Sequence, residues 1–67
     1  MSLSKSERQN KILDLIMKKE IGTQEELTEE LEHAGFHTTQ ATVSRDIREM
    51  KLTKVALSDG RLRYVAY

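Results

Sequence analysis

Residues 38–51 read Thr-Thr-Gln-Ala-Thr-Val-Ser-Arg-Asp-Ile-Arg-Glu-Met-Lys, and the apolar positions recur with the period of a helix. Val43, Ile47 and Met50 stand at i, i+4 and i+7, which predicts a helix that buries one stripe against a core. Arg45 falls on the opposite side, among hydroxyl and amide side chains. We therefore expect this helix to pack on one face and to offer hydrogen-bonding groups on the other.

Two patterns upstream predict two further helices. Ser4 and Glu7 have the S-x-x-E spacing of a capping box, so a first helix should begin after Ser4. Its broad apolar side is formed by Ile12, Leu13, Leu15, Ile16 and Met17. This helix is expected to end before Gly22, because glycine interrupts helices. Thr23 and Glu26 repeat the capping-box spacing and predict the start of a second helix.

The second helix is expected to end in a tight turn that leads to the third. Its apolar stripe is Leu27, Leu31 and Ala34. Gly35 stands where a left-handed residue ends a helix, and Phe36 can fold back onto the core. Thr38 or Thr39 is then the N-cap of the third helix. Two helices joined in this way form a helix-turn-helix, although periodicity alone equally allows an ordinary helical hairpin in a small bundle.

The C-terminal segment decides between these two architectures. A β-prone run at residues 55–57, an Asp-Gly pair at residues 59–60 and a second run at residues 62–67 predict a hairpin with a two-residue type I′ turn. That turn would place Ser58 opposite Arg61. Since an isolated hairpin is not stable, it should pack on the helices. The predicted fold class is α+β: a winged helix-turn-helix of three helices followed by a C-terminal two-stranded β-hairpin wing.

Composition limits the classes of function. The chain has 67 residues and no cysteine, so we expect one small domain over residues 1–67, without disulfides or thiolate metal sites. It has no apolar run long enough to span a bilayer and no signal-peptide pattern, which makes the cytoplasm the expected location and a membrane partner unexpected. His33 and His37 have a metal-compatible spacing, but the glycine between them breaks the helical face. We expect no metal, no cofactor in these residues and no enzymatic activity, because the chain is too small for an ordinary substrate pocket.

The formal net charge is zero, but the charges are segregated along the chain. Residues 1–19 hold five bases and two acids, residues 20–44 hold six acids and no Lys or Arg, and residues 45–67 hold six bases and three acids. A molecule polarised in this way can present a basic side to phosphates. The alternative is that the charge blocks only keep the surface solvated.

The polar face of the third helix suits the major groove of DNA. Arginine can grip guanine with two hydrogen bonds, glutamine can pair with adenine, and hydroxyls can serve bases or phosphates. The candidates for reading bases are Gln40, Thr42, Ser44 and Arg45, and the candidates for phosphate contacts are Thr39, Arg48, Lys51 and Arg61. Competing interpretations remain: Arg45 could instead pair with Glu49 one turn on, and the hydroxyl and amide groups could simply be solvated.

The run Thr39-Gln40-Ala41-Thr42-Val43-Ser44-Arg45-Asp46-Ile47, preceded by Thr23-Gln24-Glu25-Glu26-Leu27, resembles the N-terminal DNA-binding domain of the bacterial arginine repressor family. The resemblance extends from the first helix to Tyr67 and is closest to the forms found in Gram-positive bacteria. It implies a transcription regulator that binds operator DNA upstream of arginine biosynthesis genes when arginine is abundant, with the recognition helix at residues 39–51. Family members also form homo-hexamers and bind L-arginine as co-repressor through a C-terminal domain, for which this sequence has no counterpart. The resemblance therefore implies a fragment that is itself monomeric.

A different class of function is a winged-helix module for protein–protein interaction, which would use the acidic second helix, residues 25–32. Double-stranded RNA fits less well, because its deep, narrow major groove excludes side chains of this kind.

Overall fold

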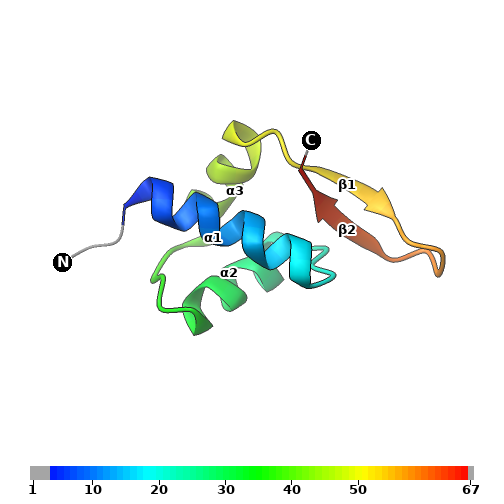
Figure 1. Ribbon diagram of the computed structural model, residues 1–67, viewed down its shortest axis with the longest axis horizontal. Coiled ribbons are helices and arrows are strands. Elements are labelled where there is room, and N and C mark those ends of the chain that lie inside the picture. The colour runs from blue at the N-terminus through cyan, green and yellow to red at the C-terminus, as the bar shows by residue number, and fades with distance from the viewer. Residues whose placement is uncertain (1–3, 67) are drawn as a thin grey trace.

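The computed structural model describes residues 4–66 and contains three helices followed by a two-stranded antiparallel sheet (Figure 1). The elements are α1 (Lys5–Lys18), α2 (Gln24–His33), α3 (Gln40–Glu49), β1 (Thr53–Ala56) and β2 (Leu62–Val65). The winged helix-turn-helix predicted from the sequence is confirmed. Residues 1–3 and 67 lie outside the described residues, including the last position of the predicted second strand.

All three helices begin at a side-chain cap. The hydroxyls of Ser4, Thr23 and Thr39 accept hydrogen bonds from the backbone N–H groups of Glu7, Glu26 and Thr42, at 3.1, 3.0 and 3.2 Å. Each cap satisfies one of the backbone donors that a helix leaves unpaired at its N-terminus. The three predicted starts are confirmed, with Thr39 rather than Thr38 capping α3.

The turn between α2 and α3 is fixed by a glycine in the left-handed conformation. Gly35 has φ of 92°, its N–H donates to the Glu32 carbonyl at 3.0 Å, and the Phe36 N–H donates to the Leu31 carbonyl at 2.8 Å. These two bonds form a Schellman motif, in which the residue after the glycine folds back. Phe36 is half-buried against the core, as predicted. The chain then enters α3, so α2 and α3 form a helix-turn-helix.

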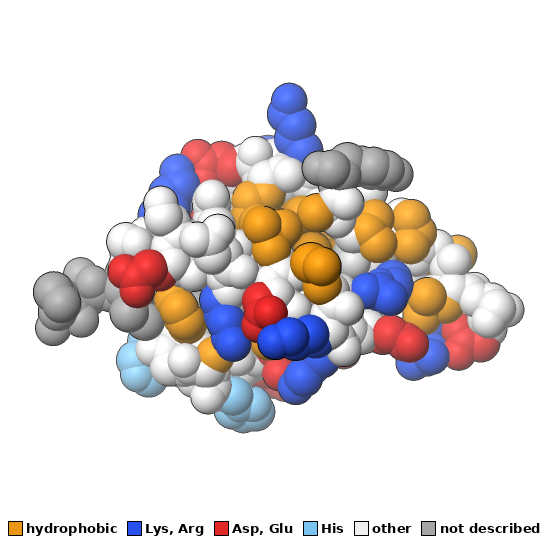
Figure 2. Space-filling view, in the orientation of Figure 1, with side chains coloured by type: hydrophobic (Ala, Val, Ile, Leu, Met, Phe, Trp, Pro, Cys, Tyr) orange, Lys and Arg blue, Asp and Glu red, His pale blue; other side chains and the backbone are white. Residues whose placement is uncertain are grey.

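The core lies where the helices and the second strand meet. Its buried members are Ile12, Leu15, Ile16, Ile21, Leu27, Leu31, Val43, Ile47, Leu52 and Tyr64. Two predicted members are wrong: Met17 is 77% exposed, and Ala34 is exposed at the C-cap of α2. The apolar side chains of α1 extend around more of the helix surface than the neighbouring elements can bury, so the Met17 side chain is left in solvent. Hydrophobic side chains consequently gather on the face shown in Figure 2, over α1 and along the hairpin.

The hairpin, which we call the wing, has a different turn from the one predicted. Ala56 pairs with Leu62 and Lys54 with Tyr64, so the register is shifted by one residue and Ser58 does not face Arg61. Residues 58–60 form a three-residue loop, with the Gly60 N–H donating to the Leu57 carbonyl at 2.9 Å and Gly60 at φ of 89°. This is the geometry of a type I turn followed by a left-handed glycine.

Three contacts dock the wing on α1 and on the segment between α1 and α2. The Tyr64 N–H donates to the Ile21 carbonyl at 2.9 Å, and the Tyr64 side chain is buried. Arg63 Nη2 donates to the Ile16 carbonyl at 2.6 Å, which satisfies an acceptor in the last turn of α1. A methyl group on Gly22 would stand 2.3 Å from the Leu62 carbonyl oxygen. Gly22 is thus needed for the close approach of β2, besides lying beyond the end of α1.

Candidate nucleic-acid interface

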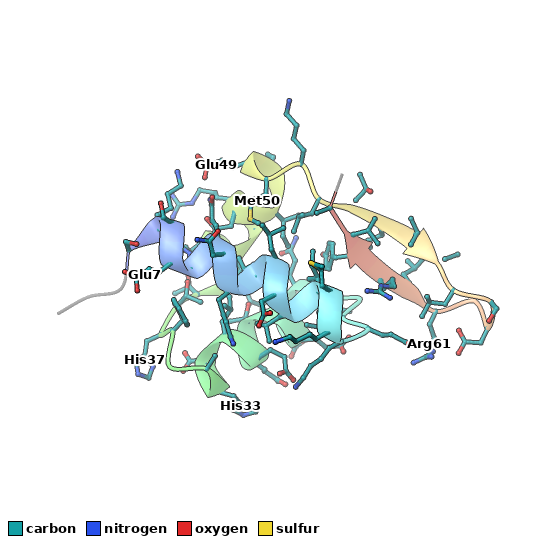
Figure 3. All side chains as sticks on the ribbon, in the orientation of Figure 1. Glu7, His33, His37, Glu49, Met50 and Arg61 are labelled. Atoms are coloured by element: carbon teal, nitrogen blue, oxygen red, sulfur yellow. The ribbon has the colours of Figure 1, made fainter. Side chains whose placement is uncertain are left out.

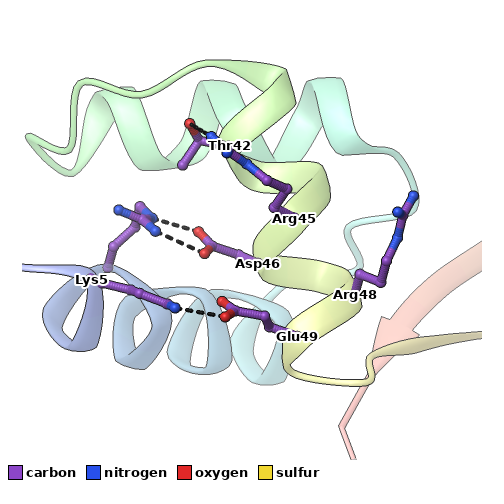
Figure 4. Close-up of a pocket in the computed structure, with 7 residues that line it drawn as sticks. Lys5, Thr42, Arg45, Asp46, Arg48 and Glu49 are labelled. Atoms are coloured by element: carbon purple, nitrogen blue, oxygen red, sulfur yellow. Dashed lines mark hydrogen bonds and ion pairs between the residues drawn. The ribbon is translucent and has the colours of Figure 1, made fainter.

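The outer face of α3 lines a hollow of about 650 Å³. Three residues predicted to contact DNA lie there together, Thr42, Arg45 and Arg48 (Figure 4). The other residues that line it are Lys5, Arg8, Asp46 and Glu49, so the N-terminal half of α1 forms one wall. With four cationic and two anionic side chains, the lining of the hollow carries a net positive charge, although the chain as a whole is neutral.

Arg45 is exposed on this face, as predicted. The contact given for its guanidinium is a long one, from Nη2 to the Thr42 hydroxyl at 3.4 Å. The alternative pairing with Glu49 does not form, because Glu49 is held from the other side. Lys5 Nζ lies 2.7 Å from one oxygen of Glu49, and Gln9 Nε2 lies 3.1 Å from the other. The hydrogen bond from Lys5 holds the pKa of Glu49 below its ordinary value.

Behind this face, Asp46 points back toward α1 and is 1% exposed. Arg8 grips its carboxylate with both arms of the guanidinium, and Gln9 adds a third donor to the same group. Burial alone would raise the pKa of Asp46, but the hydrogen bonds from Arg8 and Gln9 outweigh it and the pKa lies below 3.8. The carboxylate is therefore ionised at neutral pH, and Arg8 is neutralised by it.

The N-terminal half of α3 carries the remaining candidates for reading bases. Gln40 is exposed and Ser44 is half-buried. The Thr39 hydroxyl is committed to the fold, since it caps the helix and donates to the Thr42 hydroxyl at 3.2 Å. The Thr42 hydroxyl keeps its own proton free to donate to a ligand.

Lys51 directly follows α3 and adopts φ of 56°. Its neighbour Leu52 closes a second Schellman motif by donating to the Ile47 carbonyl at 3.0 Å. A left-handed conformation costs a lysine about 1–2 kcal/mol more than it costs glycine. The strained position places an exposed cation directly after the C-terminal end of α3.

The wing carries Arg61 away from the hollow. Figure 3 shows Arg61 on the wing at the right of the view, away from Glu49 and Met50 at the top. Its guanidinium already contacts two carboxylates, with Nε 2.6 Å from Asp59 and Nη2 2.8 Å from Glu20. These pairs are largely exposed, so they compete weakly with a phosphate. Lys54 lies over the ring of Tyr64, with Nζ 5.1 Å from the centroid.

A census of the cations singles out α3. Within the described residues 4–66, six of the eleven Lys and Arg side chains pair with carboxylates: Lys5, Arg8, Lys11, Lys18, Lys19 and Arg61. Arg63 binds a backbone carbonyl and Lys54 contacts an aromatic ring. The other three are Arg45, Arg48 and Lys51, which lie on α3 or directly after it.

The sequence-based prediction missed the contribution of α1. Lys5 and Arg8 belong to the basic block of residues 1–19, which the sequence-based prediction did not connect with the third helix, but they line the hollow and bond to α3. One signal could have revealed the partner of Arg8: Asp46 stands three residues after Val43 and four before Met50, within the apolar stripe. A charged residue at such a position needs a partner.

His33 and His37 project from the α2 end of the molecule (Figure 3), and His37 Nδ1 lies 3.1 Å from Glu32. Among residues 4–66, His, Cys, Asp and Glu side chains nowhere gather in a group of three that could hold a metal. In the same part of the chain, the helices are all too short or too polar to cross a membrane.

A family model described as the DNA-binding domain of the arginine repressor matches residues 3–67. The chain belongs to the arginine repressor family. It is 57% identical over 60 residues to the arginine repressor of Caldicellulosiruptor saccharolyticus, a match that covers 90% of this chain and 40% of that protein. It is 59% identical over 58 residues to the arginine repressor of Lachnoclostridium phytofermentans, covering 87% and 38%. The arginine repressor of Geobacillus stearothermophilus is 52% identical over 62 residues, covering 92% and 42%.

The resemblance drawn from residues 39–47 is thus confirmed. The chain spans about two fifths of the length of these curated relatives. The part of the family that this chain matches is the DNA-binding domain, and the family is one of transcription regulators rather than of enzymes.

Proposed function

We propose that this domain recognises a specific double-stranded operator by placing α3 in the major groove, and that it serves an arginine-responsive repressor of arginine biosynthesis genes. The observation that carries the proposal is the census of cations: the three without a carboxylate, carbonyl or ring partner among residues 4–66 are Arg45, Arg48 and Lys51. An exposed helix with cations that lack such partners can attract the phosphates of DNA and can hydrogen-bond to its base edges.

The roles divide between reading bases and holding phosphates. Arg45 would grip guanine, while Gln40, Thr42 and Ser44 would contact neighbouring base edges. Arg48 and Lys51 would hold phosphates on the flank of the groove, and Arg61 would do so on the wing. Thr39 would join them at the N-terminal turn by turning its hydroxyl proton from Thr42 to a phosphate. The positive end of the α3 dipole, at Thr39, favours the same orientation.

The remainder of a full-length protein would supply what these residues lack. By family resemblance, L-arginine would bind there as co-repressor and six chains would assemble through it, in the bacterial cytoplasm. The domain alone would be monomeric and bind weakly, since three or four phosphate contacts provide limited affinity. Linked domains would bind an operator far more tightly, because each bound domain raises the effective concentration of the next.

Two substitutions test the assignment of Arg45. A duplex would first be selected from a random-sequence pool by the 67-residue chain, and binding to it would be followed by fluorescence anisotropy at fixed salt. Arg45→Ala is expected to reduce affinity for this duplex by about 5- to 150-fold, which corresponds to 1–3 kcal/mol for one arginine–guanine contact. Lys18→Ala removes the same charge from the far end of α1, where Lys18 pairs with Asp14, and should change affinity little.

Unchanged binding by Arg45→Ala would refute the assignment. It would favour the alternative, a protein-interaction module that uses the acidic residues of α2. A second measurement concerns salt: the logarithm of the affinity should fall with the logarithm of salt concentration with a slope of roughly −3, for three or four phosphates. Tight, salt-insensitive binding by the isolated domain would contradict the proposed contacts.

A further inference from the structure

Asp46 is the buried charged residue of the described chain, and its geometry is tightly specified. Arg8 Nε lies 2.5 Å from Oδ2 and Arg8 Nη2 lies 2.8 Å from Oδ1. Gln9 Nε2 lies 3.1 Å from Oδ1 and also reaches Glu49 at 3.1 Å. Since a guanidinium and a carboxylate meet in a planar fork, this bidentate pair permits one orientation of the two helices at the contact.

Stability alone does not require such a pair. Apolar side chains of similar volume in place of a buried ion pair are often as stabilising or more so, because both charges must leave water. Asp46 also sits beside the apolar stripe of Val43 and Ile47, where a leucine would continue the core. What the ion pair adds is a fixed orientation of α3 relative to α1, because apolar contacts tolerate sliding and rotation that a bidentate pair does not.

The direction of α3 matters for the residues beside Asp46. Arg45 immediately precedes it, and Arg48 is two residues on. A rotation of α3 by about 15° would move a guanidinium about 8 Å from the helix axis by about 2 Å. A hydrogen bond to a base edge tolerates only a few tenths of an ångström around 2.9 Å. A small rotation would therefore leave phosphate attraction intact but would misplace the groups that read bases.

We propose that Arg8 and Asp46 are positioning residues for operator recognition: their ion pair fixes the rotation of α3 on α1, and so determines sequence selectivity rather than stability. The inference rests on the proposed function, because it concerns how α3 is presented to DNA. Figure 4 shows the arrangement, with Asp46 directed toward α1 and Arg45 directed along the outer face.

The test replaces the pair without changing net charge. The double variant Arg8→Met, Asp46→Leu would be compared with the wild-type chain in urea unfolding, and in binding to the selected duplex and to a shuffled duplex of the same composition. We expect the variant to unfold at the same urea concentration or higher. Its ratio of selected to shuffled affinity should fall by at least about fivefold, the loss of one base-specific contact. Affinity for the shuffled duplex and the salt slope should stay nearly unchanged.

A matched control is available at the C-terminal end of α1. Lys19, the residue after α1, and Glu30 of α2 form a largely exposed pair at 2.6 Å, so Lys19→Met, Glu30→Leu is equally neutral in charge. This control should keep the wild-type affinity ratio. A folded Arg8→Met, Asp46→Leu variant that also keeps the ratio would overturn the proposal.

Failure of the double variant to fold would equally contradict the claim that the pair is not needed for stability. The claim about orientation would then be decided by Arg8→Lys, which keeps the charge but cannot form the planar fork. We expect a reduced affinity ratio with an unchanged salt slope, and an unchanged ratio would overturn the claim. A wild-type chain that selects no duplex from the pool would instead refute the proposed function itself.

Discussion

Gly22→Ala is expected to destabilise the domain by displacing the wing. Gly22 lies outside the left-handed region, so an alanine can adopt its backbone conformation without strain there. The obstacle is space: the added methyl carbon would stand 2.3 Å from the Leu62 carbonyl oxygen and 3.2 Å from its carbon. Both obstructing atoms belong to the backbone of β2, which cannot rotate out of the way as a side chain can.

The magnitude follows from the distance that must be gained. Ordinary contact begins near 3.4 Å, so β2 must move by about 1 Å. The bond from the Tyr64 N–H to the Ile21 carbonyl, now 2.9 Å, would then exceed hydrogen-bonding range. Overpacking costs about 1–3 kcal/mol and the lost bond about 1 kcal/mol, while alanine lowers the entropy of the unfolded chain by about 0.4–1 kcal/mol. The net loss should be about 1–3 kcal/mol, a large fraction of the stability of so small a domain.

Urea unfolding and amide hydrogen exchange measure the two consequences separately. Gly22→Ala should lower the free energy of unfolding and should also lower protection of the Tyr64 amide beyond the global loss. Gly35→Ala is the control, because it has φ of 92° but nothing within 4 Å of the added carbon. It should be destabilised by about 1–2 kcal/mol without a local effect at Tyr64. If Gly22→Ala is as stable as wild type and its Tyr64 amide is equally protected, the steric reasoning is wrong.

Three further substitutions have defined outcomes. Lys51→Gly should raise the free energy of unfolding by roughly 0.5 kcal/mol in urea, because relief of the left-handed strain exceeds the entropy lost, yet it should reduce the salt slope of DNA binding by about 0.9. Thr39→Ala should lower the free energy of unfolding by about 1 kcal/mol, because it removes the cap of α3. Thr39→Asp should keep the cap but weaken DNA binding if position 39 meets a phosphate, and equal binding by this variant would refute that contact. Asp46 has a lowered pKa in the folded state, so its ionised form stabilises the fold relative to its protonated form; this difference is fully present above pH 3.8 and is lost as the pH falls through the folded value. Urea midpoints at pH 7 and pH 3 should therefore differ less in Asp46→Asn than in wild type.

The local features of this fold were predictable because their causes are local. A capping hydroxyl accepts a hydrogen bond from the N–H three residues later. The caps Ser4, Thr23 and Thr39 can therefore be recognised in the sequence. The same holds for Gly35, where one residue with positive φ ends a helix. The exposure of Arg45 followed from the helical period alone, once the stripe of residues 43–50 was assigned to the core.

The hairpin register was wrong for a reason that is also physical. An Asp-Gly pair serves both a two-residue type I′ turn and a three-residue loop that ends in a left-handed glycine. Here Asp59 Oδ1 accepts a hydrogen bond from the Arg61 N–H at 3.1 Å, and the Leu57 N–H donates to the Arg61 carbonyl at 2.6 Å. The side chain of Asp59 thus stabilises the longer loop, and the dipeptide alone cannot distinguish the two.

Sequence periodicity could indicate that Asp46 needs a partner, but it could not identify that partner as Arg8 on α1. Arg8 and Asp46 are 38 residues apart, and their contact depends on where two packed helices place their ends. Without knowledge of that contact, Lys5 and Arg8 cannot be distinguished from ordinary solvated cations. In the folded chain, Lys5 and Arg8 line the same hollow as Arg45 and Arg48.

The zero net charge of the chain is reconciled with a polyanionic partner by the way the acids are used. Asp46 and Glu49 neutralise Arg8 and Lys5 at the joint between the two helices, where fixed geometry is needed. Glu20 and Asp59 likewise neutralise Arg61 on the wing. Of the cations without a carboxylate partner among residues 4–66, Arg45, Arg48 and Lys51 lie at the outer face and end of α3, whereas Lys54 and Arg63 lie on the wing. The pattern of pairs, rather than the net charge, would therefore orient the domain as it approaches DNA.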